Sequence, residues 1–380
     1  MINIYFSYPD ATTFSGQTEA SRQILKLLKH NDNFVFQTNP FPAFTHKSKE
    51  NNVRKFITRL VSFYIYNIKT AFKKIDIIYL NLGQSYVKFL LHAFPILLVK
   101  FFCNTKLVIS LHGNSFIRWP NKSIILGLFK YILKKADLIT YLGENQRKSL
   151  MKLNLNNLKQ VNNCIDSSLV TKEFLVTKQN FKKTIILHLS LLIESKGFSI
   201  FLDAFNTESV QNYKKNIEAT LCGPIHFTPD DERFETALSK ENWINEKIGT
   251  LRDRNIDIKW IKGATGKYKD RIFKDTTIFV FPSTFPVEAQ PLVLLEAAAN
   301  GCAIITTETG EIKNMFTKNE VLFLKDATDV SVADGIVYLI ENPIIRQSLA
   351  YNSFKKLNAN YSVKNYENNW KSIFTNLAQI

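Results

Sequence analysis

The chain has 380 residues, of which 45% are hydrophobic and 22% are charged. This balance is that of a globular protein and excludes an intrinsically disordered chain, and the length suggests two or three domains that each bury a core. The formal net charge of +16 is unevenly distributed, because residues 1–180 contain 25 Lys and Arg against 9 Asp and Glu, whereas residues 181–380 contain 24 of each. We therefore expect the first half to face an anionic partner such as a membrane surface, a lipid diphosphate or a nucleic acid, with solvated lysines as the plainer alternative.

The beginning of the chain and its cysteines indicate a cytoplasmic protein. MINIYFSYPD lacks the basic start and the apolar core of a signal peptide. The cysteines are far apart, and none has metal-ligand spacing to another cysteine or to a histidine: Cys103, Cys164, Cys222 and Cys302. We expect a reducing cytosol.

The expected strands, taken in chain order, are short β-rich runs that alternate with amphipathic stretches. In the first half they are INIYFS (2–7), FVFQT (34–38), IDIIYL (75–80), KLVISL (106–111), DLITYL (137–142) and LKQVNN (158–163). In the second half they are TIILHLS (184–190), IEATLCG (217–223), IDIKWIK (256–262), TIFVFPS (277–283), CAIITTE (302–308) and VLFLK (321–325). Strands alternating with helices predict parallel sheets with helices on both faces, and two such series predict an α/β protein of two doubly wound Rossmann-like domains.

The most apolar segment is residues 85–102, SYVKFLLHAFPILLVKFF. It contains Lys88, Pro95 and Lys100, and a charge at the bilayer centre costs about 2.5–3.5 kcal/mol on insertion scales, so a spanning helix is not expected. A buried helix is the first interpretation, and a helix lying on a membrane surface is the second.

The domain boundary is predicted where periodicity lapses, within residues 167–184. We assign residues 1–175 to a first domain and residues 180–358 to a second domain. The chain ends in an amphipathic helix with no strand after it, and we expect this helix, residues 360–380, to pack back on the first domain.

The strongest functional signal is residues 281–310, FPSTFPVEAQPLVLLEAAANGCAIITTETG. It begins at the carboxyl end of a predicted strand, where ligands of open parallel sheets bind. Pro291 suits the first position of a helix and Asn300–Gly301 suits its end, so a helix N-terminus with free N–H groups is expected at this edge. Such a helix N-terminus favours the binding of a phosphate.

Two carboxylates flank that predicted anion site. Glu288 precedes the helix, and Glu296 lies within it, among LVLL and AAA. A charge there needs a partner or a cleft, and a carboxylate can accept two hydrogen bonds from the vicinal hydroxyls of a sugar. The alternative is that Glu296 simply faces solvent on an amphipathic helix.

These residues resemble the sugar-donor motif of glycosyltransferase family 4, retaining enzymes of the GT-B fold, in which two Rossmann-like domains face each other across a cleft. The resemblance extends over nearly the whole chain. The matching segments are FSGQTEASRQIL (14–25), LHG (111–113), VNNCID (161–166), HLSLLIESKGFSIFLDAF (188–205) and ATLCGP (219–224). It implies a hexosyltransferase of bacterial surface-polysaccharide type that uses a nucleotide-sugar donor and needs neither metal nor cofactor. It also implies that residues 1–175 form the acceptor-side domain and residues 180–358 the nucleotide-sugar-binding domain.

The resemblance also implies a role for each matching residue. Glu296 would hold the ribose diol, Glu288 would bind the donor sugar, and Lys196, followed by Gly197, would neutralise the departing diphosphate. His112 would touch the transferred sugar or relay a proton, and Gly16 would let the first loop approach the phosphates. Backbone donors at the helix start would complete the phosphate site, from Gln290, Pro291, Leu292 and Val293.

The sequence departs from the family pattern at several positions. Leu191 stands where the family usually has an Arg, so one phosphate counter-charge is missing, and Arg252, Arg254, Lys262 or Lys267 are the candidates to replace it. Losing one such cation costs on the order of 2–4 kcal/mol of transition-state stabilisation by analogy with a single oxyanion donor. The other departures lie in the glycine pairs, which read Ser15–Gly16 and Gly310–Glu311, and in the Asn-Gly motif, which reads Asn163–Cys164.

Other functions remain open at this point. The basic and aromatic segment 54–74 suggests a nucleic-acid or membrane-surface binding protein with weak or no catalysis, although no known nucleic-acid module is present. Paired carboxylates also occur in glycoside hydrolases, and sugar-nucleotide epimerases share the GT-B architecture. Absence of GxGxxG after the first strand argues against an NAD enzyme. We expect a UDP- or GDP-linked donor, a lipid-linked or growing glycan acceptor of capsule, lipopolysaccharide or exopolysaccharide synthesis, no nucleic acid, and a peripheral position on the inner face of the plasma membrane.

Overall fold

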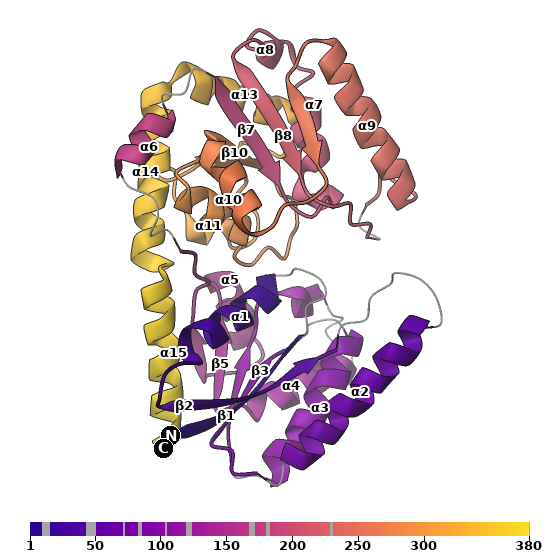
Figure 1. The fold of residues 1–380 in the computed structure, drawn as a ribbon, viewed down its shortest axis with the longest axis vertical. Helices are drawn as coiled ribbons and strands as arrows, with labels where there is room; N and C mark the ends of the chain where they lie inside the picture. The colour runs from indigo at the N-terminus through magenta and orange to yellow at the C-terminus, as the bar shows by residue number, and fades with distance from the viewer. Residues whose placement is uncertain are drawn as a thin grey trace. The chain divides into compact units, whose positions relative to one another are not determined.

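The computed structural model describes residues 1–9, 16–42, 51–70, 73–82, 86–102, 105–118, 124–166, 172–179, 183–228 and 231–379. The chain divides into two compact units (Figure 1). The first comprises Met1–Cys164 together with Val363–Ile380, and the second comprises Ile165–Ser362. The division therefore lies ahead of the predicted boundary, and residues 165–175 fall in the second unit.

The first unit is built on a parallel sheet of six strands in the order β2-β1-β3-β4-β5-β6. In that order the strands are Phe34–Phe41, Ile2–Pro9, Ile77–Asn81, Lys106–Ser110, Leu138–Tyr141 and Leu158–Gln160. Its helices are α1 (Gly16–Leu28), α2 (Asn51–Thr70), α3 (Tyr86–Phe102), the 3-10 helix η1 (Ser115–Arg118), α4 (Ile124–Lys134), α5 (Glu144–Met151) and α15 (Val363–Ala378).

The helices of the first unit form a layer on each face of the sheet. One core cluster joins α2, α3 and α4 to the face that carries Tyr5, Ile78 and Leu107. A second cluster joins α1 and α15 to the opposite face, where Phe6 and Tyr79 stack with ring centroids 4.1 Å apart. The strands are apolar on both sides because both sides are covered.

The second unit repeats this architecture with the strand order β12-β11-β10-β7-β8-β9, again all parallel. In that order the strands are Leu322–Phe323, Ala303–Thr306, Ile278–Phe281, Thr184–Leu189, Ile217–Cys222 and Ile258–Ile261. Its helical segments are α6 (Lys172–Gln179), η2 (Glu194–Lys196), α7 (Phe198–Ala204), α8 (Glu208–Gln211), α9 (Ala237–Asp253), α10 (Gly266–Asp275), α11 (Leu292–Ala299), α12 (Ile312–Met315), α13 (Asp329–Glu341) and α14 (Pro343–Asn360).

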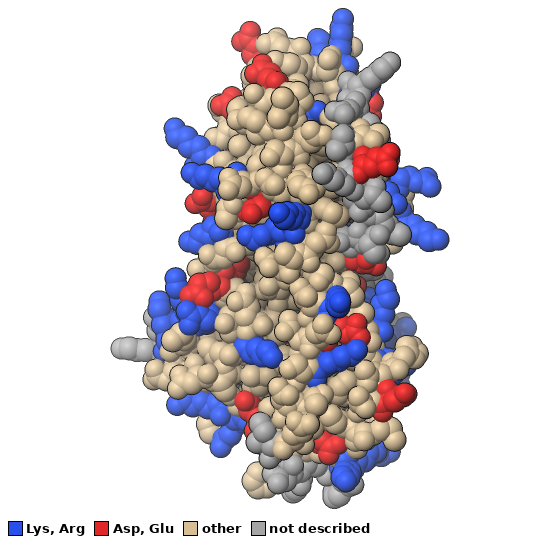
Figure 2. Space-filling model, turned by 90° about the vertical axis from the view of Figure 1, so that its left-hand side faces the viewer, with Lys and Arg blue, Asp and Glu red and all other residues tan. Residues whose placement is uncertain are grey.

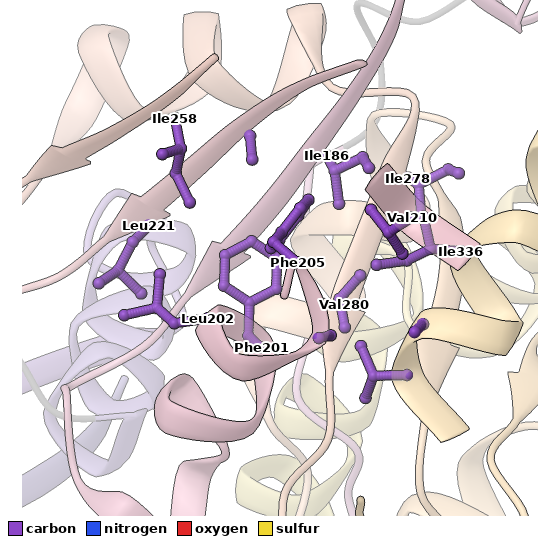
Figure 3. Packing of buried hydrophobic residues seen from close by; sticks show 14 of the residues in the cluster. Ile186, Phe201, Leu202, Phe205, Val210, Leu221, Ile258, Ile278, Val280 and Ile336 are labelled. Carbon is purple, nitrogen blue, oxygen red and sulfur yellow. The ribbon is translucent and has the colours of Figure 1, made fainter. Parts of the chain in front are cut away.

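The core of the second unit also has two layers. Figure 3 shows one of them, in which Phe201 of α7 and Phe205, just after that helix, pack against Ile186, Leu221 and other apolar residues of the sheet. The opposite layer packs α10, α11 and α12 on the other side of the same strands. A buried aliphatic and aromatic filling on both faces is what keeps a parallel sheet stable.

The fold class expected from the sequence is confirmed. All twelve predicted strands are present, and each half forms a doubly wound parallel sheet. The segment 85–102 contains helix α3, which buries Phe89 and Ile96 but exposes Phe94 and Phe101, so it is neither wholly buried nor wholly superficial. Among the helices that the structure describes, none combines the length and apolarity needed to cross a bilayer.

Candidate active site

The second unit has its topological switch point between β7 and β10. The chain runs outward from β7 to β8 and β9, and then returns to place β10 on the other side of β7. The loops after these two neighbouring strands leave in opposite directions, which opens a crevice at the carboxyl edge where ligands of such sheets bind. Lys196 follows β7, and Glu288 follows β10, so the fold brings both to this edge.

Lys196 and Glu288 form an ion pair there. The Glu288 side chain is 6% exposed and the Lys196 side chain is 19% exposed, so both charges are largely withdrawn from water. The Ser283 hydroxyl donates a hydrogen bond to Glu288 Oε1 at 3.0 Å. The ammonium of Lys196 lies 4.6 Å from the centre of the Phe285 ring, and the ring's negative face adds to its stabilisation. A cation and a carboxylate are thus held together in a mostly apolar environment, where charge–charge interactions are strong.

The two loops are joined through their backbones. The Thr284 N–H donates to the carbonyl of Ser195 at 2.8 Å. Gly197 has a φ of 84°, and a Cβ built on it would lie 2.4 Å from the carbonyl oxygen of Pro282. Only glycine permits this approach without strain. The glycine after Lys196 therefore lets the loop that carries the lysine pack against the loop that carries Glu288.

A second glycine supports Glu288 from the other side. Gly310 has a φ of 59°, and a Cβ at this position would lie 2.4 Å from the Glu288 carbonyl oxygen. The next residue, Glu311, donates its N–H to the same oxygen at 2.9 Å. Gly310 thus permits the close packing of this loop, although the second glycine of the family's pair is absent.

A buried ion pair anchors the loop ahead of Lys196. Asp231 and Lys240 lie 2.8 Å apart, and both side chains are 0% exposed. The Asp231 carboxylate accepts the Glu194 N–H at 2.7 Å, and the Lys240 ammonium donates to the Leu192 carbonyl at 2.9 Å. Burial raises the pKa of Asp231, but the hydrogen bonds from Lys240 and from backbone N–H groups outweigh it and lower that pKa below its ordinary value. The backbone just before Lys196 is therefore fixed at two points.

His188 connects the two central strands beneath the site. Its Nδ1 lies 3.0 Å from the Val280 carbonyl, and its Nε2 lies 2.9 Å from the Ser190 hydroxyl. Burial lowers the pKa of His188 to about 4, so the ring is neutral at pH 7 and its Nδ1–H donates to Val280. This histidine had no predicted role, and it acts as a hydrogen-bonded core residue.

Helix α11 carries the second predicted carboxylate. The Glu296 side chain is 16% exposed and pairs with Lys269 of α10, so the interpretation that it faces solvent is wrong. Pro291 is the N-cap and not the first helical residue, and proline has no N–H to offer a phosphate. The helix ends as predicted, with Asn300 as the C-cap and Gly301 in the left-handed conformation, at a φ of 68°.

The remaining residues of the predicted donor-binding stretch lie at the start of α11. The Gln290 side chain is buried, whereas Leu292 and Val293, in the first turn, are partly buried. The backbone N–H groups of Leu292 and Val293 have no acceptor within the helix, because both residues belong to its first turn.

The first unit has a comparable switch point between β1 and β3. Gly16 begins α1, and the loop before it, residues 10–15, lies outside the described residues. Gln17, next to Gly16, donates to the Asn81 side chain at 2.8 Å and to the Leu82 carbonyl at 2.9 Å, which ties the start of α1 to the end of β3. The fold thus holds Gly16 at the carboxyl edge of this sheet.

His112 lies two residues after β4, at the same edge of the first sheet. Its Nε2 is 3.0 Å from the Ser110 hydroxyl, which also accepts a hydrogen bond from Thr140 at 2.9 Å. The residue as a whole is partly exposed, but burial of the ring lowers the pKa of His112 to about 4, so the imidazole is neutral at pH 7. His112 and Gly16 therefore belong to the first unit, whereas the lysine and both glutamates of the predicted site belong to the second.

Two of the cations suggested as substitutes for the missing arginine are in the wrong place. Arg252 donates to the Ile258 carbonyl at the start of β9, and Arg254 contacts Asn206. Both lie at the amino edge of the sheet, whereas Leu191 lies at its carboxyl edge, two residues after β7. Lys262 follows β9 at the carboxyl edge but pairs with Glu241 on the surface.

Several residues of the site were not predicted. Lys269, the partner of Glu296, has no signal in the sequence beyond the amphipathic pattern of its helix. In that helix the predicted candidate to replace the missing arginine was Lys267. Phe285 and Ser283 stood inside the recognised motif without a role. Asp231 lies in the acidic stretch 228–235 and is nevertheless buried, whereas Pro229 and Asp230 lie outside the described residues.

The described part of the chain contains no cluster of side chains that indicates metal binding. Within the ranges that the structure describes, no three His, Cys, Asp or Glu side chains form a group suited to a metal ion. The prediction of a metal-independent reaction stays a prediction.

Comparison with known proteins adds the family of the second unit. Residues 171–356 match the family model described as Glycosyl transferases group 1, and this range includes Lys196, Glu288 and Glu296. The second unit is a group 1 glycosyltransferase domain. The prediction of a glycosyltransferase is therefore confirmed at the level of this domain. No curated protein matches the sequence significantly.

Solved structures resemble nearly the whole chain and not the second unit alone. Anabaena HepE, solved in complex with UDP and glucose, has a TM-score of 0.71 at 13% identity, over 99% of this chain and 100% of that one. The sucrose-phosphate synthase of Thermosynechococcus elongatus has a TM-score of 0.75 at 15% identity, over 99% of both chains. A glycosyltransferase from Rickettsia africae has a TM-score of 0.70 at 14% identity, over 99% of this chain and 98% of that one. At these identities the likeness concerns the fold, and it confirms the GT-B fold class.

Proposed function

We propose that the chain is a retaining, metal-independent glycosyltransferase of family 4 that moves a hexose-type sugar from a UDP- or GDP-linked donor to a lipid-linked or growing glycan. The observation that carries this proposal is the Lys196–Glu288 pair at the switch point between β7 and β10. A cation beside a carboxylate at this edge suits a ligand with a diphosphate next to a polyhydroxylated sugar. The structural neighbour HepE, solved with UDP-glucose, binds a ligand of this class.

Lys196 can serve the donor without leaving Glu288. An ammonium has three N–H donors, so one can remain on Glu288 while the others bind oxygens of the diphosphate. Glu288 then accepts hydrogen bonds from hydroxyls of the donor sugar, which places the sugar beside the diphosphate. Glu296 binds the ribose diol, and the N–H groups at the start of α11, those of Leu292 and Val293, add positive potential near the phosphates.

The transfer itself exchanges two bonds at the anomeric carbon. The bond from that carbon to the diphosphate oxygen breaks, and its electron pair stays on the diphosphate, where Lys196 and the helix N–H groups stabilise the negative charge. The acceptor hydroxyl oxygen forms its bond on the same face, and its proton passes to the leaving diphosphate. His112 touches the transferred sugar or relays this proton.

The acceptor belongs to the synthesis of a bacterial capsule, lipopolysaccharide or exopolysaccharide. The basic first half of the chain is suited to an anionic lipid or glycolipid, and a lipid-linked acceptor requires the enzyme to work at a membrane surface. We accordingly propose a cytoplasmic protein that binds the inner face of the plasma membrane peripherally.

The test is calorimetric binding of UDP, GDP and ADP without added metal, to the wild type, to Glu296→Ala and to the control Glu246→Ala, which alters an exposed glutamate of α9. We expect one nucleotide to bind to the wild type and the control, and the affinity to fall at least tenfold in Glu296→Ala. If none binds at millimolar concentration, the missing arginine at Leu191 has abolished donor binding and the proposal is wrong. Release of a free epimerised nucleotide sugar would instead identify an epimerase.

A further inference from the structure

Three neighbouring helices of the first unit present apolar side chains to solvent. In Figure 1, α2, α3 and α4 lie on the same face of the first sheet, and one core cluster holds all three against it. Each helix buries an inward stripe and exposes a second, outward stripe at helical spacing. We call the outward set the three-helix face: Ile57, Val61, Ile65, Ile68, Leu90, Phe94, Phe101, Ile124, Leu128 and Tyr131.

The exposure of this face is large for such side chains. Phe101 is 82% exposed, Phe94 is 62% exposed and Ile124 is 90% exposed. Isolated apolar residues on a surface need no explanation, but an exposed apolar stripe on each of three neighbouring helices is typical of an interaction site. The inward stripes already fill the core, so folding of the unit does not require the outward ones.

The surroundings of the three-helix face are strongly basic. Residues 51–136 contain 14 Lys and Arg and a single acidic residue, Asp76, and two of these cations, Lys100 and Lys106, pair with Asp137 just after the range. Asp76 accepts the backbone N–H of Asn3 at 2.7 Å, at the start of β3, so it does not belong to the helices. None of α2, α3 and α4 contains an acidic residue. By contrast, Figure 2 shows the face of the molecule that carries α15, where acidic and basic side chains are interspersed.

We infer that the three-helix face docks on an anionic lipid bilayer, with its apolar side chains in the interface between headgroups and acyl chains and its cations on the lipid phosphates. Apolar and basic side chains on one surface are the combination that holds a helix in this interface. The inference deepens the proposed function, on which it rests for its purpose, because it names the surface by which the enzyme reaches a lipid-linked acceptor.

Charge argues against the other occupants. A second copy of the chain would bring two acid-free basic surfaces together, and like charges repel. A nucleic acid would match the charge, but it would leave the aliphatic stripes of α2 against a phosphate backbone that offers them no apolar surface. Only a lipid bilayer satisfies the apolar and the basic side chains together.

The experiment is flotation of the full chain with vesicles of phosphatidylcholine alone and with vesicles containing 30% phosphatidylglycerol. Phe94→Ser with Phe101→Ser tests the apolar contribution, and Arg54→Glu with Lys69→Glu tests the charge. The matched controls change exposed residues of the second unit: Val330→Ser with Ile344→Ser, and Lys313→Glu with Lys318→Glu. We expect the wild type and both controls to bind the anionic vesicles, and each test variant to lose binding at least tenfold.

Nucleotide binding by calorimetry on the same samples separates this inference from the proposed function. Vesicle binding that persists in both test variants, or that is equal on neutral and anionic vesicles, would overturn the inference even if UDP or GDP binds normally. If the chain self-associates and the Phe94→Ser, Phe101→Ser variant does not, the partner of the three-helix face is a second copy of the chain and not a bilayer. If the chain binds duplex DNA more tightly than vesicles, the partner is a nucleic acid. Loss of nucleotide binding alone would leave the inference standing and remove the proposed function.

Discussion

The buried Asp231–Lys240 pair is the part of the site whose removal has the most definite consequence. Asp231→Asn leaves the Lys240 ammonium without its counter-charge at a position that is 0% exposed, and Lys240→Met leaves the Asp231 carboxylate in the same state. Breaking one side of a buried pair costs about 3–5 kcal/mol, because the remaining charge has lost its water and its partner. Since a domain is stable by only about 5–15 kcal/mol, each single variant should be severely destabilised.

The double variant, Asp231→Asn with Lys240→Met, separates the role of the charges from the role of the packing. It leaves no unpaired charge, so we expect it to be more stable than either single variant, with a coupling free energy of at least about 2 kcal/mol. It still lacks the hydrogen bond from Lys240 to the Leu192 carbonyl, so the loop before Lys196 should be held less firmly. Donor affinity should therefore stay reduced after stability is regained.

The assay is urea unfolding of the wild type and the three variants, followed by calorimetric nucleotide binding of those that fold. Lys262→Met is the matched control, because Lys262 pairs with Glu241 at the surface with 66% of its side chain exposed, and such a pair contributes about 0–1 kcal/mol. Single variants that each cost less than about 1 kcal/mol, or a double variant whose cost is the sum of the two, would refute the reasoning.

Three further predictions concern the same unit. Gly197→Ala should lower the free energy of unfolding by about 1–3 kcal/mol and weaken nucleotide binding, because the residue has a φ of 84°. The control is Gly249→Ala in α9, where an added Cβ meets nothing within 4 Å, and thermal unfolding should show it to be neutral or stabilising. Burial lowers the pKa of His188 to about 4 from an unfolded value of about 6.5. The contribution of the neutral ring to the free energy of unfolding is therefore complete above pH 6.5 and falls by up to about 3 kcal/mol as the pH drops towards 4. Unfolding of His188→Gln, measured as a function of pH, should lack this component, and an unchanged slope of the unfolding free energy against pH would contradict the assignment. Lys269→Met removes the partner of Glu296, and calorimetry should show the nucleotide Kd rise roughly tenfold; an unchanged Kd would mean that Lys269 does not orient this carboxylate.

The local pattern of the sequence was sufficient for the elements and for much of the site. Apolar runs of β-branched residues separated by amphipathic stretches predicted all twelve strands. This is possible because the spacing of apolar residues that marks a strand or a helix is a property of consecutive residues. Asn300–Gly301 marked the end of α11 for the same reason. Lys196 and Glu288 could be named because each lies in a recognisable motif directly after a strand.

Which residues meet was decided by the tertiary structure. Lys196 and Glu288 are 92 positions apart, and they pair only because β10 returns to the side of β7, an order that no short-range pattern encodes. The same holds for the ion pair of Lys269 with Glu296, which connects α10 to α11. A sequence lists the charges of a protein, but the free energy of a charge depends on its distance to others and on its exposure to water, and both are set only when the chain has packed.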